Sequence, residues 1–456
     1  MGKFKENSVL ENFSSGFFVY NGGNPDLDKN RVANNKSYGV FVTEKGLGHY
    51  HHNHIHGNLD VNFAVASEST PLVEHNFIYD GAKAGIGCFD SSIGRFFRNN
   101  VYGNTFAGAY VTENAIPVFE ENEIHHQIDG YGIWVYGAGV PRIINNQIHS
   151  NTVANVAVSE TGTPHIEGNQ IFTSEGYGVW YYSEGNQGGK GLLLNNDVYE
   201  NENDNVCVTE GSDPLIKGNR IFASAASGVR VCNFGKGKYT ENDIYGNAES
   251  GVVIHDSGMA HFERNKFRDN GARGIWIYDE GGGTIWYNEV YGNEDAGIFV
   301  SDGVTPEVLG NKCFGGKKSG IGIVNAGGRF MNNEAFGNHL SGIFVSSGKC
   351  LISQCKIYEN EGPGVWFMNP GQPTIRDCDI YKNIGSGITV SEKADPIVSK
   401  NKIRNGVTQG VSVLDAGYGS FTHNEIFQNE KDGFAIKGAG TNPHIENNNI
   451  YSGISR

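Results

Sequence analysis

The sequence predicts an all-β fold, a single-stranded right-handed parallel β-helix of about 20 coils with ~23 residues per coil. One short motif recurs along almost the whole chain, and its apolar residues alternate with polar ones in brief runs bounded by Gly, Asn and Pro. No segment shows a helical periodicity long enough to cover a parallel sheet. Glycine accounts for 65 of the 456 residues and proline for 12, which excludes a collagen-like chain and a proline-rich disordered one.

The motif begins with P-x-I-x-x-N-x-I, of which Pro141–Ile148 is a clear copy, and continues about nine residues later with G-Φ-x-Φ, where Φ is apolar. Its asparagine slot recurs every 22 to 24 residues, with one step of 27. We therefore expect residues 1–456 to form one continuous domain. The slot is occupied by Asn7, Asn30, Asn53, Asn76, Asn99, Asn122, Asn146, Asn169, Asn196, Asn219, Asn242, Asn265, Asn288, Asn311, Asn333, Cys355, Cys378, Asn401, Asn424 and Asn448.

Each coil is expected to turn through three short strands, because ~23 residues cannot hold a helical crossover as well. Coils stacked ~4.8 Å apart would give a rod of roughly 95 Å. The slot asparagine and the apolar residue two positions later should face inward. Successive side-chain amides would then hydrogen-bond from coil to coil as a ladder.

Charge and cysteine usage favour an intracellular protein. The formal charge, 35 − 50 = −15, argues against binding to nucleic acid or to an anionic membrane surface. There is no run of 18 apolar residues and no apolar secretion signal in the first residues. The seven cysteines lack C-x-x-C spacing, which favours reduced thiols in a cytoplasmic or otherwise intracellular setting. Cys355 and Cys378 take adjacent rungs and could accept a disulfide, but two buried thiols are the preferred interpretation.

The x position of G-Φ-x-Φ should point outward and is rich in large aromatic residues. Such a row indicates either a binding surface or cross-strand stacking that stabilises the sheet, and both interpretations stay open. The row contains Trp134, Trp180, Trp276 and Trp366, together with Phe17, Phe41, Tyr110, Phe299 and Phe344.

One sizeable insertion interrupts the regular spacing beside Trp180. It comprises Tyr181, Tyr182 and the loop 184–191. A loop on a rigid scaffold is a plausible place for specificity, although neutral surface insertions are also common in repeat proteins.

Five histidines, at positions 49, 51, 52, 54 and 56, surround the slot residue Asn53. His52, His54 and His56 are expected to project from one face as an i, i+2, i+4 line. Such a line spreads its imidazoles apart, so these residues are only weak candidates for zinc or nickel ligands, and a polar outer face is the preferred interpretation. No metal and no cofactor are predicted.

Enzymes with this fold need recognisable carboxylate arrangements. A calcium-dependent lyase needs an aspartate cluster beside a basic residue, and a glycosidase needs two carboxylates on one face. The outward acidic residues Asp256, Asp279, Glu280 and Asp302 are expected in solvated turns. No D-P-H-E or G-H-G segment of the epimerase or polygalacturonase kind is present. No catalytic residue is predicted, and a non-enzymatic role is favoured.

Three segments, Glu241–Asn247, Ser250–Ile254 and Pro214–Ile221, resemble the repeats of the carbohydrate-binding-and-sugar-hydrolase (CASH) β-helix family. The resemblance covers residues 7–451 and is greatest to the β-helix of F-box only protein eleven, a substrate receptor of a ubiquitin ligase. This sequence has neither the helical F-box nor the zinc module of that protein, so a ligase role does not carry over. The resemblance implies a protein- or peptide-binding rod.

The sequence thus favours a non-catalytic protein-recognition or structural scaffold, with end-to-end contacts or membership of a larger assembly as further expectations. Its expected apolar anchors are Trp134, Trp180, Tyr182, Trp276, Phe299, Phe344 and Trp366. The alternative is a carbohydrate-binding or carbohydrate-active protein, in which the same rings would stack on sugars. Carboxylates beside the rings would favour the sugar interpretation.

Overall fold

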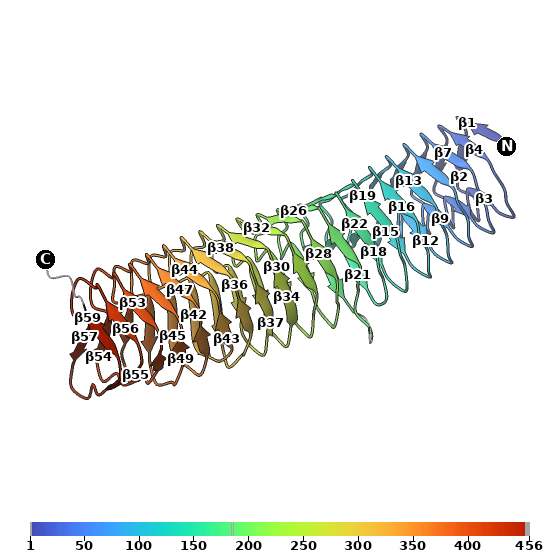
Figure 1. The fold of residues 1–456 in the computed structure, drawn as a ribbon. Helices are drawn as coiled ribbons and strands as arrows, with labels where there is room; N and C mark the ends of the chain where they lie inside the picture. Colours follow the sequence, from blue (N-terminus) through green and yellow to red (C-terminus); the bar gives the residue numbers. More distant parts are fainter. Residues whose placement is uncertain (1, 184, 186, 452–456) are drawn as a thin grey trace. The chain divides into compact units, whose positions relative to one another are not determined.

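The computed structural model describes residues 2–183, 185 and 187–451, and the part of the chain that it describes contains strands and turns but no helix. At three strands per coil, its 59 strands make 19 full coils and part of another, which confirms the predicted all-β solenoid (Figure 1). No helix among these residues is long and apolar enough to cross a membrane.

The chain divides into two units, each described by itself below. Unit 1 is Met1–Arg230 with Phe234–Lys238, and unit 2 is Val231–Asn233 with Tyr239–Arg456. The single continuous domain stays a prediction.

One coil of unit 1 consists of β4 (Asp26–Asp28), β5 (Arg31–Ala33) and β6 (Val40–Val42). The next consists of β7 (His49–His51), β8 (His54–His56) and β9 (Phe63–Val65). Each strand pairs in parallel with the strand one coil later, β4 with β7, β5 with β8 and β6 with β9. The three resulting sheets are called A, B and C, in the order in which each coil visits them.

A sharp bend separates sheets A and B in every coil. In the first of these coils, Lys29 has a φ of 56°, and in the second His52 has the same value. The residue with the left-handed conformation turns the chain sharply. As a result, the slot asparagine that follows it faces inward. Asn30 and Asn53 are accordingly buried, as the repeat predicts.

The slot asparagines form the predicted ladder. In unit 1, the Asn122 side-chain oxygen accepts hydrogen bonds from the backbone N–H and the side-chain amide of Asn99, at 2.9 and 3.1 Å. Its own amide donates to the Asn146 oxygen at 2.9 Å and to the Phe96 carbonyl at 3.0 Å. Every polar atom of this buried side chain therefore has a partner.

In unit 2, two rungs of the ladder are cysteines. The backbone N–H of Cys355 donates to the Cys378 sulfur at 3.4 Å, and both residues are buried. All seven cysteines are free, which agrees with the preferred interpretation of buried thiols.

A second amide ladder, which the sequence reasoning missed, runs five residues after the first. In unit 1 it links Asn12, Asn35 and Asn58 through amide-to-oxygen bonds of 2.7 and 2.8 Å. Gly81 occupies the next rung and has no side chain to continue it. The signal was present as a second asparagine column with the same period.

Asn62 closes the gap that Gly81 leaves. Its oxygen accepts from the Asn58 amide at 2.7 Å, and its own amide donates to the Asn104 oxygen at 2.9 Å. Asn62 stands where most coils have the glycine of G-Φ-x-Φ. Asn155 repeats the arrangement by joining Asn151 to Asn201 across Ser174.

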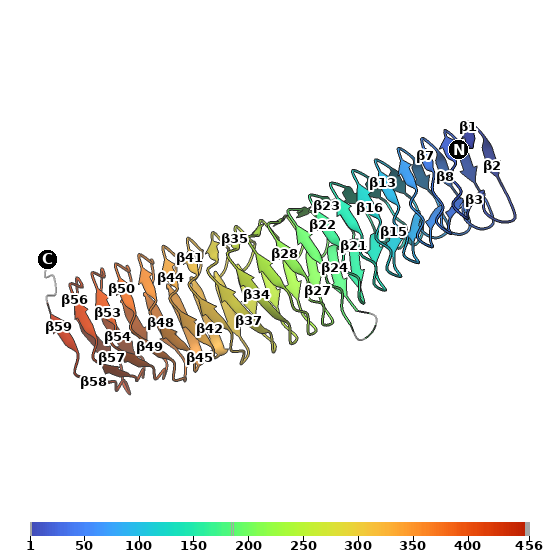
Figure 2. The same cartoon turned by 45° about the vertical axis from the view of Figure 1, so that its right-hand side comes forward.

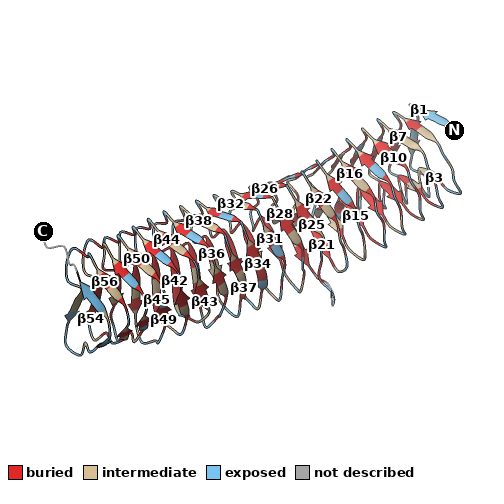
Figure 3. Cartoon of the chain, in the orientation of Figure 1, coloured by how far each residue is buried: buried red, intermediate tan, exposed pale blue. Residues whose placement is uncertain are grey.

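Unit 2 repeats the same coil. Its sheet C contains β36 (Ile275–Ile277), β39 (Ile298–Ser301), β42 (Ile321–Ala326), β45 (Ile343–Gly348) and β48 (Val365–Met368), paired in parallel in that order. The inward residues of these strands are buried (Figure 3). The outward aromatic residues Trp276, Phe299, Phe344 and Trp366 are partly exposed, whereas the outward Gly322 is buried.

The insertion lies in unit 1, between β24 (Tyr177–Tyr182) and β25 (Leu192–Leu194). Two residues of the predicted loop, Glu184 and Asn186, lie outside the described residues. Strand β24 pairs with β21 (Ala154–Ser159) on one side and β27 (Val206–Val208) on the other (Figure 2).

Candidate functional site

The outer face of sheet C carries the predicted aromatic row, with one correction. In β3 (Phe17–Val19), Phe17 is in register with the buried Val40 and Phe18 with Phe41. Phe18 is 53% exposed and holds the outward position. The assignment of Phe17 to the row was wrong, because the residue directly after the motif glycine faces inward.

The aromatic residues of unit 1 largely cover one another. Trp134 stacks on Tyr136 with ring centroids 4.0 Å apart, and Trp180 stacks on Tyr182 at 4.1 Å. Ala157, the outward residue between the two tryptophans, is fully buried. Stacking between aromatic residues two positions apart in the same coil, together with the close packing of Ala157 between the tryptophan strands, therefore accounts for this part of the row.

Tyr182 does not fit the predicted role of an exposed anchor. Only 4% of it is exposed, and its hydroxyl lies 3.3 Å from that of Tyr131, two coils earlier. The stacking of Tyr182 on Trp180 and its hydrogen-bonding contact with Tyr131 explain why this surface position is covered.

In unit 2 the first two rings of the row share a cation. The Arg273 guanidinium lies 4.2 Å from the ring centroid of Trp276 and 4.6 Å from that of Phe299. Arg273 also forms an ion pair with Asp295 at 3.3 Å. One face of each ring is thus occupied by the protein's own cation.

Further along unit 2 the row opens into a concavity of about 200 Å³, which we call the aromatic hollow. Phe299, Phe344 and Trp366, three of the predicted anchors, converge on it. The remaining lining residues are Asp295, Ala296, Lys318, Ser319, Gly322 and Leu340.

Gly322 creates the hollow because it holds the outward position between Phe299 and Phe344. A Cβ atom on Gly322 would lie 2.6 Å from the Phe299 ring, so a larger residue would displace this ring. On the other side, the Phe344 and Trp366 rings meet edge to face at 5.5 Å, and the Trp366 indole N–H donates to the Ser391 hydroxyl at 3.1 Å. The rings are therefore held in place before any ligand binds.

The rim of the hollow is polar and asymmetric. The Asp295 carboxylate is engaged with Arg273, as described above. Lys318 is exposed and forms no ion pair within the described part of the chain. Leu340 adds an apolar side chain that is 44% exposed. The hollow thus combines ring faces with one anionic and one free cationic group.

The predicted line of three histidines is wrong. The bend at His52 places His54 and His56 on sheet B, where they stack on Phe77 and Tyr79 at 4.9 and 4.6 Å. His49 and His51 lie instead on sheet A. The prediction treated residues 52–56 as one extended strand and missed the left-handed turn.

The acidic turn residues behave as expected from the sequence. Glu280 and Asp302 line a second concavity in unit 2, but each carboxylate has a serine partner. Glu280 accepts from the Ser257 hydroxyl at 3.0 Å and Asp302 from the Ser301 hydroxyl at 2.9 Å. Asp256 and Asp279 occupy left-handed turn positions, with φ of 48° and 47°.

The chain was compared with known proteins. The family model described as the right handed beta helix region matches residues 2–116, 94–188, 185–313 and 307–450. The chain belongs to the right-handed β-helix family. This agrees with the predicted fold and its handedness, whereas the finer resemblance to F-box only protein eleven stays a prediction. No curated protein matches the chain.

Several solved structures show a distant similarity to this chain. The A-module of the mannuronan C-5 epimerase AlgE6 from Azotobacter vinelandii has 15% identity and a TM-score of 0.40, over 74% of this chain and 90% of that one. The periplasmic alginate epimerase AlgG has 13% identity and a TM-score of 0.36, and the match covers 70% of this chain and 76% of that one. PfbA, a surface adhesin of Streptococcus pneumoniae, has 10% identity and a TM-score of 0.27, and the match covers 76% of this chain and 85% of that one. These similarities concern the fold alone.

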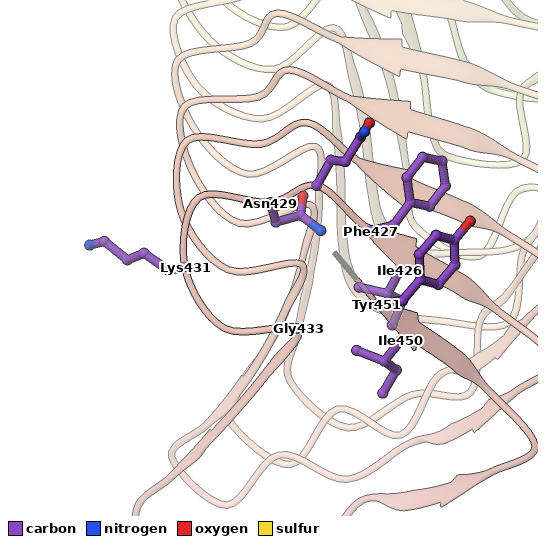
Figure 4. Close-up of a pocket in the computed structure, with 8 residues that line it drawn as sticks. Ile426, Phe427, Asn429, Lys431, Gly433, Ile450 and Tyr451 are labelled. Atoms are coloured by element: carbon purple, nitrogen blue, oxygen red, sulfur yellow. The ribbon is translucent and has the colours of Figure 1, made fainter. Parts of the chain in front are cut away.

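A hollow at the last described coil of this β-helix lies beside β56 (Glu425–Phe427) and β59 (Asn449–Tyr451) (Figure 4). Ile426 is buried, whereas Ile450 is 48% exposed. The hollow is an exposed part of the core at the end of the described coils, and we assign no ligand to it.

The β-helix has a second aromatic column, on the outer face of sheet B in unit 1, which the sequence reasoning missed. Neighbouring rings lie 4.6 to 5.3 Å apart with nearly parallel planes. The signal was an aromatic residue directly after the inward apolar residue of N-x-I. The column consists of Tyr79, Tyr102, His125, His149, Phe172, Tyr199 and Phe222.

His125 should make the β-helix sensitive to acid. Burial lowers its pKa from 6.5 to about 4, the nearby His149 and His126 also lower it, and Glu123 partly opposes them. Below pH 6.5 the unfolded chain takes up a proton that the folded chain accepts only near pH 4, so stability should fall as the pH drops through this window. We expect the melting temperature, measured by circular dichroism, to fall by about 2 °C between pH 7 and pH 5 from this group.

The matched variant is His125→Phe, which continues the ring stack without a titratable group. Its melting temperature should fall less over the same pH range. An equal fall in the two proteins would assign the acid sensitivity to other groups, of which His149 is the first to test because burial also lowers its pKa.

Proposed function

We propose that this β-helix binds a carbohydrate chain at the aromatic hollow of unit 2. The observation that carries the proposal is the convergence of Phe299, Phe344 and Trp366 around the glycine-floored concavity at Gly322. The apolar face of a sugar ring packs on an aromatic ring, while its hydroxyl groups need hydrogen-bonding partners at the edge. Asp295 and Lys318 supply such partners.

The shape of the site supports a sugar ligand over a flat protein interface. The hollow is small and concave, and its rings are fixed by contacts within the protein. Protein interfaces instead bury large, nearly flat areas. Asp295 is the only carboxylate among the lining residues, whereas glycoside cleavage uses a pair, so the proposal is binding without hydrolysis at this place.

The test is a binding titration by calorimetry with soluble hexasaccharides of glucose, mannose, galacturonate and mannuronate. We expect at least one to bind, and we expect Trp366→Ala to weaken that binding by at least tenfold, because loss of the ring removes about 1.4 kcal/mol or more of contact energy. Gly322→Leu, which fills the hollow, should have the same effect.

The matched control is Tyr287→Ala. Tyr287 is an exposed aromatic residue of unit 2 that lies outside the hollow. Its substitution should leave the affinity unchanged. Absence of binding to all four oligosaccharides, or equal affinity of the Trp366→Ala and wild-type proteins, would overturn the proposal.

The second candidate is recognition of a protein or peptide, the role favoured by the sequence. The exposed apolar side chain of Leu340 at the rim supports it, since such a side chain can pack on a peptide anchor. A pull-down with the wild type and a folded Trp180→Ala, Trp276→Ala, Trp366→Ala variant separates the two functions. A protein partner lost in the variant, without any oligosaccharide binding, would favour protein recognition. An intracellular location stays a prediction.

A further inference from the structure

The outer face of sheet A in unit 1 gathers histidine and carboxylate side chains from neighbouring coils. Asp26, His49 and His51 each offer a ligand atom, and these atoms all lie within 4.8 Å of one another. We propose that these three residues form a divalent metal site, with Zn²⁺ as the ion that suits them best. The site is separate from the aromatic hollow and does not depend on the proposed function.

Strand register explains why the residues meet. Asp26 pairs with His49, and Asp28 pairs with His51, because β4 and β7 are adjacent parallel strands. The outward positions of each strand are two residues apart, so all four side chains project from the same face. His51 reaches diagonally to Asp26, with its Nε2 atom 3.0 Å from the carboxylate oxygen.

Neighbouring groups orient both imidazoles. The Nε2 atom of His49 lies 2.8 Å from the Glu74 carboxylate. The Nδ1 atom of His51 lies 3.0 Å from Nδ1 of His52 and 3.3 Å from the Asp28 carboxylate. A histidine that donates one ring N–H to a carboxylate presents its other nitrogen as a metal ligand. Glu74 thus acts as a positioning residue for His49, and the contact of the His51 Nδ1 atom with His52 leaves Nε2 of His51 directed at Asp26.

Charge and geometry favour a cation at this place. Asp26, Asp28 and Glu74 contribute three carboxylates, and Lys5 balances one of them through an ion pair with Asp28 at 3.2 Å. The His49 and His51 rings stack with centroids 4.2 Å apart, so small rotations would bring their nitrogens to a common ion. Two imidazoles and one carboxylate match the preferred ligands of Zn²⁺, and water would complete a tetrahedral site.

The site differs from the one predicted from sequence. His54 and His56 take no part in it, since they lie on sheet B. His52 belongs to a second group with Asp28 and His51, but it is more exposed and lies 3.9 Å from Asp28. His51 belongs to both groups and is therefore the residue on which binding should depend most.

The experiment is a calorimetric titration of the full chain with ZnCl₂ at pH 7.5, after removal of any affinity tag. We expect one Zn²⁺ per chain. His51→Ala and Asp26→Asn should each weaken binding by at least tenfold, the lower end of the loss expected for disturbed ligands. His54→Ala is the matched control, because it removes an outward histidine three residues away on sheet B, and it should bind as the wild type does.

A second readout distinguishes binding at this site from a change in fold. Co²⁺ in a site with histidine and carboxylate ligands gives a visible absorption spectrum, which should be lost in His51→Ala while the circular dichroism spectrum stays unchanged. Absence of Zn²⁺ binding in the wild type, or equal binding by wild type and a folded His51→Ala variant, would overturn the proposal.

Discussion

Asn122→Ala should destabilise the coils of unit 1 around it by about 3–5 kcal/mol, because each buried polar group left without a partner costs about 1–3 kcal/mol. The substitution removes the acceptor of two donors of Asn99 and the donor to the Phe96 carbonyl. No water can replace these bonds unless the coil opens, since both asparagines are buried. Amide hydrogen exchange in β14 (Asn100–Tyr102) and β17 (Glu123–His125) measures this local effect.

The control for this prediction is Asn100→Ala in the neighbouring coil. Asn100 follows the ladder residue Asn99 directly but faces outward, where it contacts His125 and Glu123. Its substitution should change stability by only about 0.5 kcal/mol. Equal exchange rates in the Asn122→Ala and Asn100→Ala variants would show that the amide ladder does not hold the coils together.

Asn62→Gly should destabilise unit 1 by about 2–4 kcal/mol, and the second substitution Gly81→Asn should restore most of the loss. Asn62→Gly removes the side chain that accepts from Asn58 and donates to Asn104. An asparagine at position 81 would occupy the vacant rung of the second ladder, as Asn35 and Asn58 do in their own coils. The double variant would then have glycine at the start of G-Φ-x-Φ and asparagine in the second ladder, as most coils do.

A thermodynamic cycle on the four proteins checks this result. Guanidinium unfolding followed by circular dichroism should give a favourable interaction energy between the two substitutions. The single variant Gly81→Asn should itself be destabilised, because a Cβ at position 81 would lie 2.7 Å from the Asn62 amide nitrogen. Additive effects of the two substitutions would contradict the proposed exchange of rungs.

The candidate site was only partly accessible to sequence reasoning. The outward position of Phe299, Phe344 and Trp366 was correct, because strand alternation places side chains on a known face. Their convergence around Gly322 was not foreseen, since a hollow depends on the absence of a side chain as much as on its neighbours. Tyr182 lay at an expected surface position and is nevertheless covered, because Trp180 of the same strand stacks on it and Tyr131, two coils earlier, contacts its hydroxyl.

The sequence by itself determined the inward half of this protein. A fixed period of asparagine and the alternation of apolar residues were enough to predict three strands per coil, parallel stacking and the first amide ladder. Only the tertiary structure decided which outward side chains meet. His51 and Asp26 are 25 residues apart in the sequence and touch diagonally between adjacent coils. The left-handed turn at His52 places His54 and His56 on another sheet. Inward positions recur with the period of the repeat and can therefore be predicted from it. Outward contacts depend on turn geometry, strand register and side-chain length, and the sequence of one repeat does not specify these.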